Sequence, residues 1–330
     1  MISAMEVLVY AIGTVSVVSV SVFIMLCRML NKPPPSGGSA YTLPNGLVIQ
    51  HWQKDESDFL YREIFGAESA YSRGGLIFRP GALIIDAGAN IGMFSLFAAG
   101  ACKGAARILS FEPIPSTFVV LAANARAASA GEYAAVLGAV KGQSALSIEA
   151  INVGLSDATA HVTFQHHPHF SVWSTSDAVF AEARLTRIAD DMPRALATSD
   201  SWFLRNCFPS ALARLLAKIV LRGKVGKMES VPVKLERLSD VIDGRSVGPI
   251  IDFLKIDVEG AELKVMAGLR DDHWAMVQQC ALEVENFANR DVVLAILKGH
   301  GFETDYFASE RERNPGVESE VSMVYGIRPA

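Results

Sequence analysis

Short apolar runs separated by amphipathic stretches dominate the chain after its first eighty residues. Five runs have the length of buried strands: 82–86, 106–113, 147–157, 251–257 and 280–286. The segments that follow the first and second runs have helical periodicity. Strands that alternate with helices in this way predict an α/β fold with a doubly wound parallel sheet, covered by helices.

The stretch before the first run has a different pattern. Residues 43–52 (LPNGLVIQHW) predict a hairpin that turns at Asn45-Gly46. Residues 55–69 then predict a helix with one apolar side, formed by Phe59, Leu60, Ile64 and Phe65. We therefore expect a small N-terminal hairpin and helix beside the sheet.

The first forty residues do not belong to this pattern. Residues 7–27 are an uncharged run of 21, which is long enough to cross a bilayer as a helix. No Lys or Arg precedes the run, whereas Arg28 and Lys32 follow it. The sequence thus predicts a membrane anchor over 1–30 that leaves the C-terminal body in the cytosol.

A linker and an insertion complete the predicted organisation. Residues 31–41 are rich in Pro, Gly and Ser, so the folded domain is expected over 42–330. Within it, 165–230 is too long for an ordinary connection and predicts a helical lid or substrate element. A basic amphipathic helix at 210–227 suits a membrane surface, although an ordinary surface helix with its apolar side on the core is the favoured interpretation.

Composition narrows the classes of partner. The net charge of -5 argues against nucleic acid, which needs clustered Lys and Arg. The four cysteines have neither metal-ligand nor redox spacing, which indicates reduced thiols. The body is therefore typical of a protein that acts on small molecules in a reducing compartment.

The loop after the first strand carries the first candidate chemistry. It reads Asp86-Ala-Gly88-Ala-Asn90-Ile-Gly92 and does not match the dinucleotide fingerprint G-x-G-x-x-G. An acid before the glycines would repel a pyrophosphate, which favours a nucleoside without phosphates, such as S-adenosylmethionine. Glu112 ends the second strand, where a carboxylate can accept both ribose hydroxyls.

These segments also carry a family resemblance. The sequence resembles the FkbM family of S-adenosylmethionine-dependent methyltransferases from about residue 42 to the end. The opening LPNGLVIQHW and the segment WFLRN are similar to the subgroup associated with polyketide assembly. The resemblance rests on DAGANIGMFS, SFEPIPSTFVVLAANA, INVGLSDA, LERLSDVID, IDFLKIDVEGAELKVMAGL, ALEVEN and VYGIRP.

The resemblance implies a class I methyltransferase fold and O-methylation of a hydroxyl on a polyketide-like, lipid or glycan substrate. It implies that Glu112 binds the ribose. Asp157 is a candidate for the adenine amino group, and it equally suits a turn that caps its own backbone. The residues implied to hold the methionine end are Asp86, Gly88, Asn90 and Gly92.

Methyl transfer to an alcohol also needs a group that takes the hydroxyl proton. His167, which lies after the third strand, is the preferred candidate for such a base, and a solvated polar loop is its alternative. Asp257 and Glu285 end the fourth and fifth strands, where acids can act on the substrate, bind it or cap helices. Asp257, Glu285 and Asn286 are also oxygen ligands of the kind that suits Mg²⁺, although a protein base is favoured over a metal. Lys255 and Glu259 are expected to form an ion pair that orders the loop.

Two other classes of function remain as alternatives. A nicotinamide-dependent oxidoreductase predicts the dinucleotide fingerprint, which is absent. A membrane-anchored scaffold without catalytic activity would be expected to lack the glycine loop or Glu112, and both are present. A membrane-anchored O-methyltransferase is therefore the leading hypothesis.

Overall fold

The structure is a computed structural model. It describes residues 38–67, 69–140, 145–166, 215, 229–245, 247–284, 287–308 and 321–329. The predicted anchor, the basic helix 210–227 apart from Leu215, and nearly all of the predicted insertion lie outside these residues. Among the residues that the structure does describe, no helix is long and apolar enough to cross a membrane.

The predicted N-terminal hairpin and helix are both present. Strands β1 (Ser39–Thr42) and β2 (Val48–His51) pair antiparallel. The turn at Asn45-Gly46 is confirmed, because Gly46 has a φ of 90° and the Asn45 side chain accepts the Leu47 N–H at 3.2 Å. Strand β1 occupies the last residues of the predicted linker, so the folded body begins earlier than expected.

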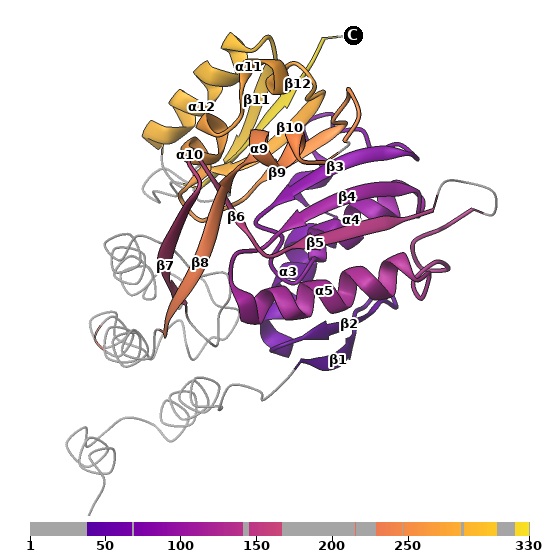
Figure 1. Ribbon diagram of the computed structural model, residues 1–330. Coiled ribbons are helices and arrows are strands. Elements are labelled where there is room, and N and C mark those ends of the chain that lie inside the picture. Colours follow the sequence, from indigo (N-terminus) through magenta and orange to yellow (C-terminus); the bar gives the residue numbers. More distant parts are fainter. Residues whose placement is uncertain are drawn as a thin grey trace, which may run out of the picture. The chain divides into compact units, whose positions relative to one another are not determined.

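A seven-stranded sheet forms the centre of the body, in the order β11-β12-β10-β9-β3-β4-β5 (Figure 1). The strands from β10 to β5 run parallel, as predicted, and strand order reverses between β3 and β9. Strand β12 is antiparallel to both its neighbours, which was not predicted. The bounds are β3 Ala82–Ala87, β4 Ala106–Phe111, β5 Ser147–Ile151, β9 Phe253–Ile256, β10 Gln279–Val284, β11 Glu303–Ala308 and β12 Ser322–Ile327.

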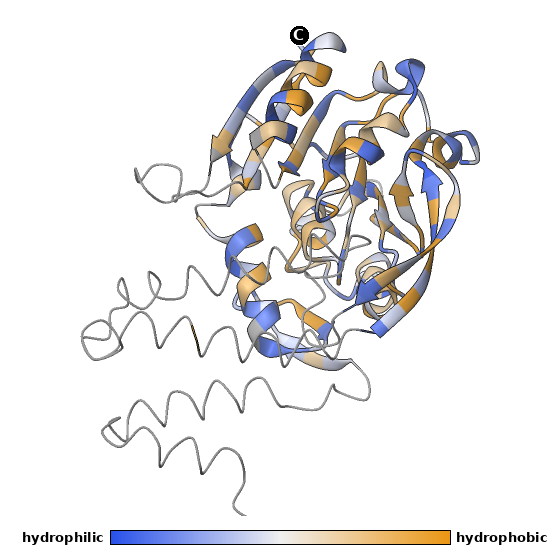
Figure 2. Ribbon diagram, turned by 90° about the vertical axis from the view of Figure 1, so that its left-hand side faces the viewer, coloured by the Kyte–Doolittle hydropathy of each residue, from blue (hydrophilic) through white to orange (hydrophobic). Residues whose placement is uncertain are grey.

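Helices cover both faces of the sheet, since alternate residues of each strand enter two separate apolar clusters. Ile84 packs on one face and Ile85 on the other. Figure 2 shows that apolar residues concentrate on the central strands. The first face carries α3 (Lys54–Phe65), α4 (Met93–Ala101) and α5 (Pro115–Ser129), and the second α9 (Leu238–Asp243), α10 (Glu262–Ala267), α11 (Asp271–Trp274) and α12 (Phe287–Gly299).

The prediction of one strand over 147–157 was wrong. The run splits at Asn152, whose side-chain amide donates to the carbonyls of Glu112 and Pro113 at 2.8 and 3.1 Å. The Asn152 side chain thus bonds to the two carbonyls that follow β4, and the backbone leaves the sheet after β5. The remainder forms β6 (Gly154–Ser156) in a second sheet, which we call the side sheet, with β7 (Ala160–His166) and β8 (Glu229–Arg237).

The carboxyl ends of β3 and β9 touch at Gly88. The Asp257 N–H donates to the Ala87 carbonyl at 3.1 Å. Gly88 has a φ of 80°, and a Cβ added there would lie 1.8 Å from the Asp257 carbonyl oxygen. No side chain fits at Gly88, so the glycine is required by the contact between these strands.

The close contact at Gly88 leads to a prediction about the stability of the fold. Gly88→Ala is expected to lower the free energy of unfolding by about 3–5 kcal/mol, from left-handed strain and a steric clash together. Gly81→Ala is the matched control, because Gly81 has a similar φ of 87° with nothing within 4 Å of an added Cβ. Denaturant unfolding should give about 1–2 kcal/mol for that variant. Equal losses would contradict the steric contact.

Candidate active site

Three polar residues lie side by side on the strands at the centre of the sheet. Asp86 is in register with Ser110 on β4 and with Lys255 on β9. Their apolar neighbours two residues earlier, Ile84 and Phe253, belong to the cluster under α4. The period of two therefore points all three polar side chains at that helix.

Asp86 is completely buried within this group. Its Oδ2 accepts the hydroxyl of Ser95 on α4 at 2.7 Å, and its Oδ1 accepts the Lys255 ammonium at 3.1 Å. The Ser95 and Ser110 hydroxyls are 2.8 Å apart. The structure thus places Asp86 behind the glycine loop and outside the lining of the pocket, although the family resemblance implied contact with the cofactor.

Lys255 connects this buried group to the glycine loop and to Asp257. Its Nζ donates to the Gly88 carbonyl at 2.8 Å and lies 3.3 Å from Asp257 Oδ2. Burial lowers the pKa of Lys255, but the charges of Asp86 and Asp257 outweigh burial, so the pKa is raised and the ammonium stays charged. The expected ion pair with Glu259 was wrong, because the two aspartates take its place.

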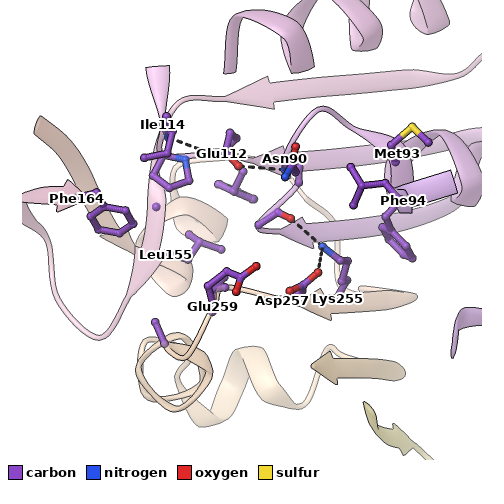
Figure 3. A pocket seen from close by; sticks show the side chains of 18 of the residues that line it. Asn90, Met93, Phe94, Glu112, Ile114, Leu155, Phe164, Lys255, Asp257 and Glu259 are labelled. Carbon is purple, nitrogen blue, oxygen red and sulfur yellow. Dashed lines mark hydrogen bonds and ion pairs between the residues drawn. The ribbon is translucent and has the colours of Figure 1, made fainter. Parts of the chain in front are cut away.

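A pocket opens in front of these groups, at the carboxyl ends of the strands (Figure 3). Its volume, counted with the part open to solvent, is about 880 Å³. Phe164 and Leu155 lie at one end, Phe94 and Lys255 at the other, with Glu112 between them. The lining also includes Leu60, Ile64, Gly88, Ala89, Asn90, Met93, Ile114, Leu235, Asp257, Val258 and Glu259, whereas Gly92 is not part of it.

Glu112 lies in the middle of this pocket, held by two backbone groups. Its Oε2 accepts the Asn90 N–H at 3.1 Å, and its Oε1 accepts the Ile114 N–H at 2.9 Å. Burial raises the pKa of Glu112 to about 7, although both hydrogen bonds oppose the rise. Each carboxylate oxygen keeps further acceptor capacity for a ligand hydroxyl.

Asn90 presents the loop to the same pocket in a conformation that is rare for a residue with a side chain. Its φ is 49°, and its Oδ1 accepts the Ile91 N–H at 2.6 Å. Asparagine tolerates this conformation because its short side chain can bond to the local backbone. Asn90 is therefore fixed against Glu112, and the two residues meet as the sequence predicts.

Asp157 is not brought to the pocket. It follows β6 in an exposed bend, and its Oδ1 accepts the Ser156 hydroxyl at 3.0 Å. The side sheet instead presents Leu155, Phe164 and Leu235 to the pocket. The sequence did not predict that these three residues line the pocket. The alternation of apolar and polar residues in β6, β7 and β8 does not show that these strands form a sheet of their own.

Three other candidates, His167, Glu285 and Asn286, lie outside the described residues. Within the part of the chain that is described, no three His, Cys, Asp or Glu side chains group as metal ligands. Leu60 and Ile64 on α3 line the pocket near Asp257. Their helical spacing placed them on one apolar face, but did not indicate a role at the site.

The residues of the pocket fit a nucleoside cofactor without phosphates. Lys255 is the one basic residue of its described lining, and two carboxylates and a carbonyl already hold it. A pyrophosphate would find no free cation there. Gly88 lines the pocket with its backbone, and Glu112 offers a carboxylate to the ligand.

Comparison with known proteins supports this assignment. The methyltransferase FkbM domain model matches residues 86–304. The 31-O-demethyl-FK506 methyltransferase FkbM of Streptomyces tacrolimicus is 34% identical over 262 residues, which are 79% of this chain and 87% of that protein. Methyltransferase sdnD of Sordaria araneosa is 30% identical over 283 residues, 83% of this chain and 91% of its own.

Two further matches are partial or distant. The AMB antimetabolite synthetase AmbE of Pseudomonas aeruginosa is 33% identical over 267 residues, and the match spans 79% of this chain but 11% of AmbE. The solved precorrin-6Y C5,15-methyltransferase of Geobacter metallireducens is 10% identical, covers 76% of this chain and 82% of its own, and superposes with a TM-score of 0.34. From the domain match and the two relatives covered over most of their length, the chain belongs to the FkbM methyltransferase family and is an S-adenosylmethionine-dependent methyltransferase.

Proposed function

We propose that this protein transfers a methyl group from S-adenosylmethionine to a hydroxyl oxygen. The observation that carries the proposal is the pocket itself, with Glu112 and the glycine loop at its centre and the Asp257 carboxylate near one end. A non-catalytic scaffold would not require these groups to converge on one cavity. Bound S-adenosylmethionine would supply a methyl group already activated by its sulfonium charge.

Each part of the pocket has a proposed role in holding the cofactor. Gly88 and Asn90 would lie against the methionine part, and Glu112 would accept the ribose hydroxyls. The apolar end formed by Ile114, Leu155, Phe164 and Leu235 would enclose the adenine. Asp86 would act indirectly, by fixing Lys255 and α4 behind the loop. Asp157 would then be a turn residue, one of its two original readings.

Asp257 is the proposed acceptor of the hydroxyl proton. Its side chain is 30% exposed, so it can reach a substrate while Lys255 holds it at 3.3 Å. As the oxygen–carbon bond forms, the hydroxyl proton would pass to this carboxylate. His167 and Glu285 remain alternative bases, and Asp257 with Glu285 and Asn286 remains the less favoured Mg²⁺ site.

The proposed acceptor is a hydroxyl on a polyketide-like, lipid or glycan molecule. The name of the Streptomyces relative specifies a 31-O-demethyl-FK506 substrate, which supports the polyketide-like class. Leu60 and Ile64 offer apolar contact for the body of such a substrate. The anchor 1–30 and the helix 210–227 would hold the enzyme at a membrane, with its catalytic domain in the cytosol, which supports a lipid or membrane-delivered substrate.

The role of Glu112 predicts pH-dependent cofactor binding. Below its pKa of about 7, Glu112 is protonated and loses the charge that strengthens its bonds to ribose hydroxyls. Calorimetry should therefore show S-adenosylmethionine binding up to about tenfold more weakly at about pH 6 than at about pH 8. Glu112→Gln should weaken binding and remove this dependence.

Asp157→Asn is the matched control for Glu112→Gln. Its carboxyl group is exposed and outside the pocket, so the variant should keep the affinity and pH dependence of the wild type. Folded wild-type protein that released no heat with S-adenosylmethionine at any pH would refute the assigned cofactor site.

A second prediction concerns Asp257 and the identity of the acceptor. Mass spectrometry of extracts from a deletion strain should reveal a compound lighter by one methylene, and that compound is the acceptor for an assay. With it, Asp257→Asn should lower turnover by about 100-fold or more, because no base takes the proton. S-adenosylhomocysteine should still bind this variant. Unchanged turnover would remove Asp257 from the chemistry, and a product methylated on nitrogen or carbon would contradict O-methylation.

A further inference from the structure

Asp86, Lys255 and Asp257 form one charged group beside the pocket, which we call the charge triad. The ammonium lies 3.1 Å from Asp86 Oδ1 and 3.3 Å from Asp257 Oδ2. Asp86 is completely buried, Lys255 is 3% exposed, and Asp257 opens to the pocket. One positive and two negative charges leave the triad with one net negative charge at the methyl end of the site.

We propose that Lys255 is a positioning and charge-balancing residue. It holds Asp257 in place, and its ammonium reduces the net charge of the charge triad that faces the sulfonium from two negative charges to one. The inference rests on the proposed binding mode of S-adenosylmethionine. It goes beyond that binding mode, because it assigns to Lys255 and Asp86 a shared role that neither has alone.

The surroundings of Lys255 support charge balance over ordinary packing. Its Nζ has three oxygen partners and lies 5.6 Å from the centre of the Phe94 ring. These contacts fix the position of the ammonium. Burial of the Asp86 carboxylate without a cation would be costly. The Lys255 ammonium neutralises that buried charge and leaves the charge of Asp257 to face the pocket.

This arrangement has a consequence for cofactor exchange. S-adenosylmethionine carries a positive sulfonium, whereas the product S-adenosylhomocysteine has a neutral sulfur. One net negative charge nearby favours the reactant over the product, and it does so without binding the reactant as tightly as two would. The ratio of the two dissociation constants therefore reports the net charge of the triad.

The test compares that ratio in variants that change the charge. Calorimetry at about pH 8.5 keeps Glu112 ionised, given its pKa of about 7. Asp86→Asn makes the triad neutral, and should reduce the preference for S-adenosylmethionine by about tenfold, as expected for a unit charge about 10 Å away at an effective dielectric constant of about 20. Adding Lys255→Met restores one net negative charge, so the double variant Asp86→Asn/Lys255→Met should regain the preference of the wild type.

A purely structural role for Lys255 makes the opposite prediction. The double variant, which loses one more buried contact, would then have the same preference as Asp86→Asn or a weaker one, and that result would overturn the proposal. Asp157→Asn removes a carboxylate outside the pocket and should leave the ratio unchanged. Thermal melting checks that each variant is folded.

A second pair of variants covers a failure of the first to fold. Asp86→Ser should lower the preference in the same way, and Asp86→Ser/Lys255→Leu should restore it through the remaining charge of Asp257, which opens to the pocket. Wild-type protein that bound neither compound would refute the proposed function itself. Binding of both with no recovery in either double variant would refute the charge triad alone.

Discussion

The contact between the carboxyl ends of β3 and β9 is the constraint on which the rest of the site depends. These strands are far apart in the chain, and they meet where strand order reverses. The Gly88 backbone lies against the Asp257 carbonyl with no room for a side chain, and Lys255 bonds across the junction. The glycine loop and the Asp257 carboxylate are thereby fixed relative to each other.

The other residues that line the pocket are arranged around this contact. Helix α3 supplies Leu60 and Ile64 to the lining, and the side sheet supplies Leu155, Phe164 and Leu235. Leu155 and Phe164 lie at the end of the pocket away from Lys255 (Figure 3). Glu112 occupies the middle because Asn90 and Ile114 fix both of its oxygens. A pocket with one apolar end, a carboxylate in its middle and charged groups at its other end suits a ligand with an apolar ring, hydroxyls in its middle and a charged tail.

The sequence predicted the polar residues of the site better than the apolar residues that line the pocket. Asp86, Glu112 and Asp257 end apolar runs, and parallel strands bring such ends to one edge of a sheet. The same logic could not show that Asp86 points at α4 and serves Lys255, because that depends on the packing of Ser95. It also gave no sign that Asn152 would end β5, since the cause is a side-chain amide bonded to carbonyls of another strand.

The pairing of β7 with β8 has an evolutionary consequence. His166 and Glu229 face each other at the open end of this antiparallel pair, so the long intervening segment leaves and re-enters the fold at neighbouring points. Such a junction tolerates replacement of what it carries, because the register of the strands below it is already set. Evolution can therefore exchange the intervening segment while Phe164 and Leu235 keep their places in the lining of the pocket.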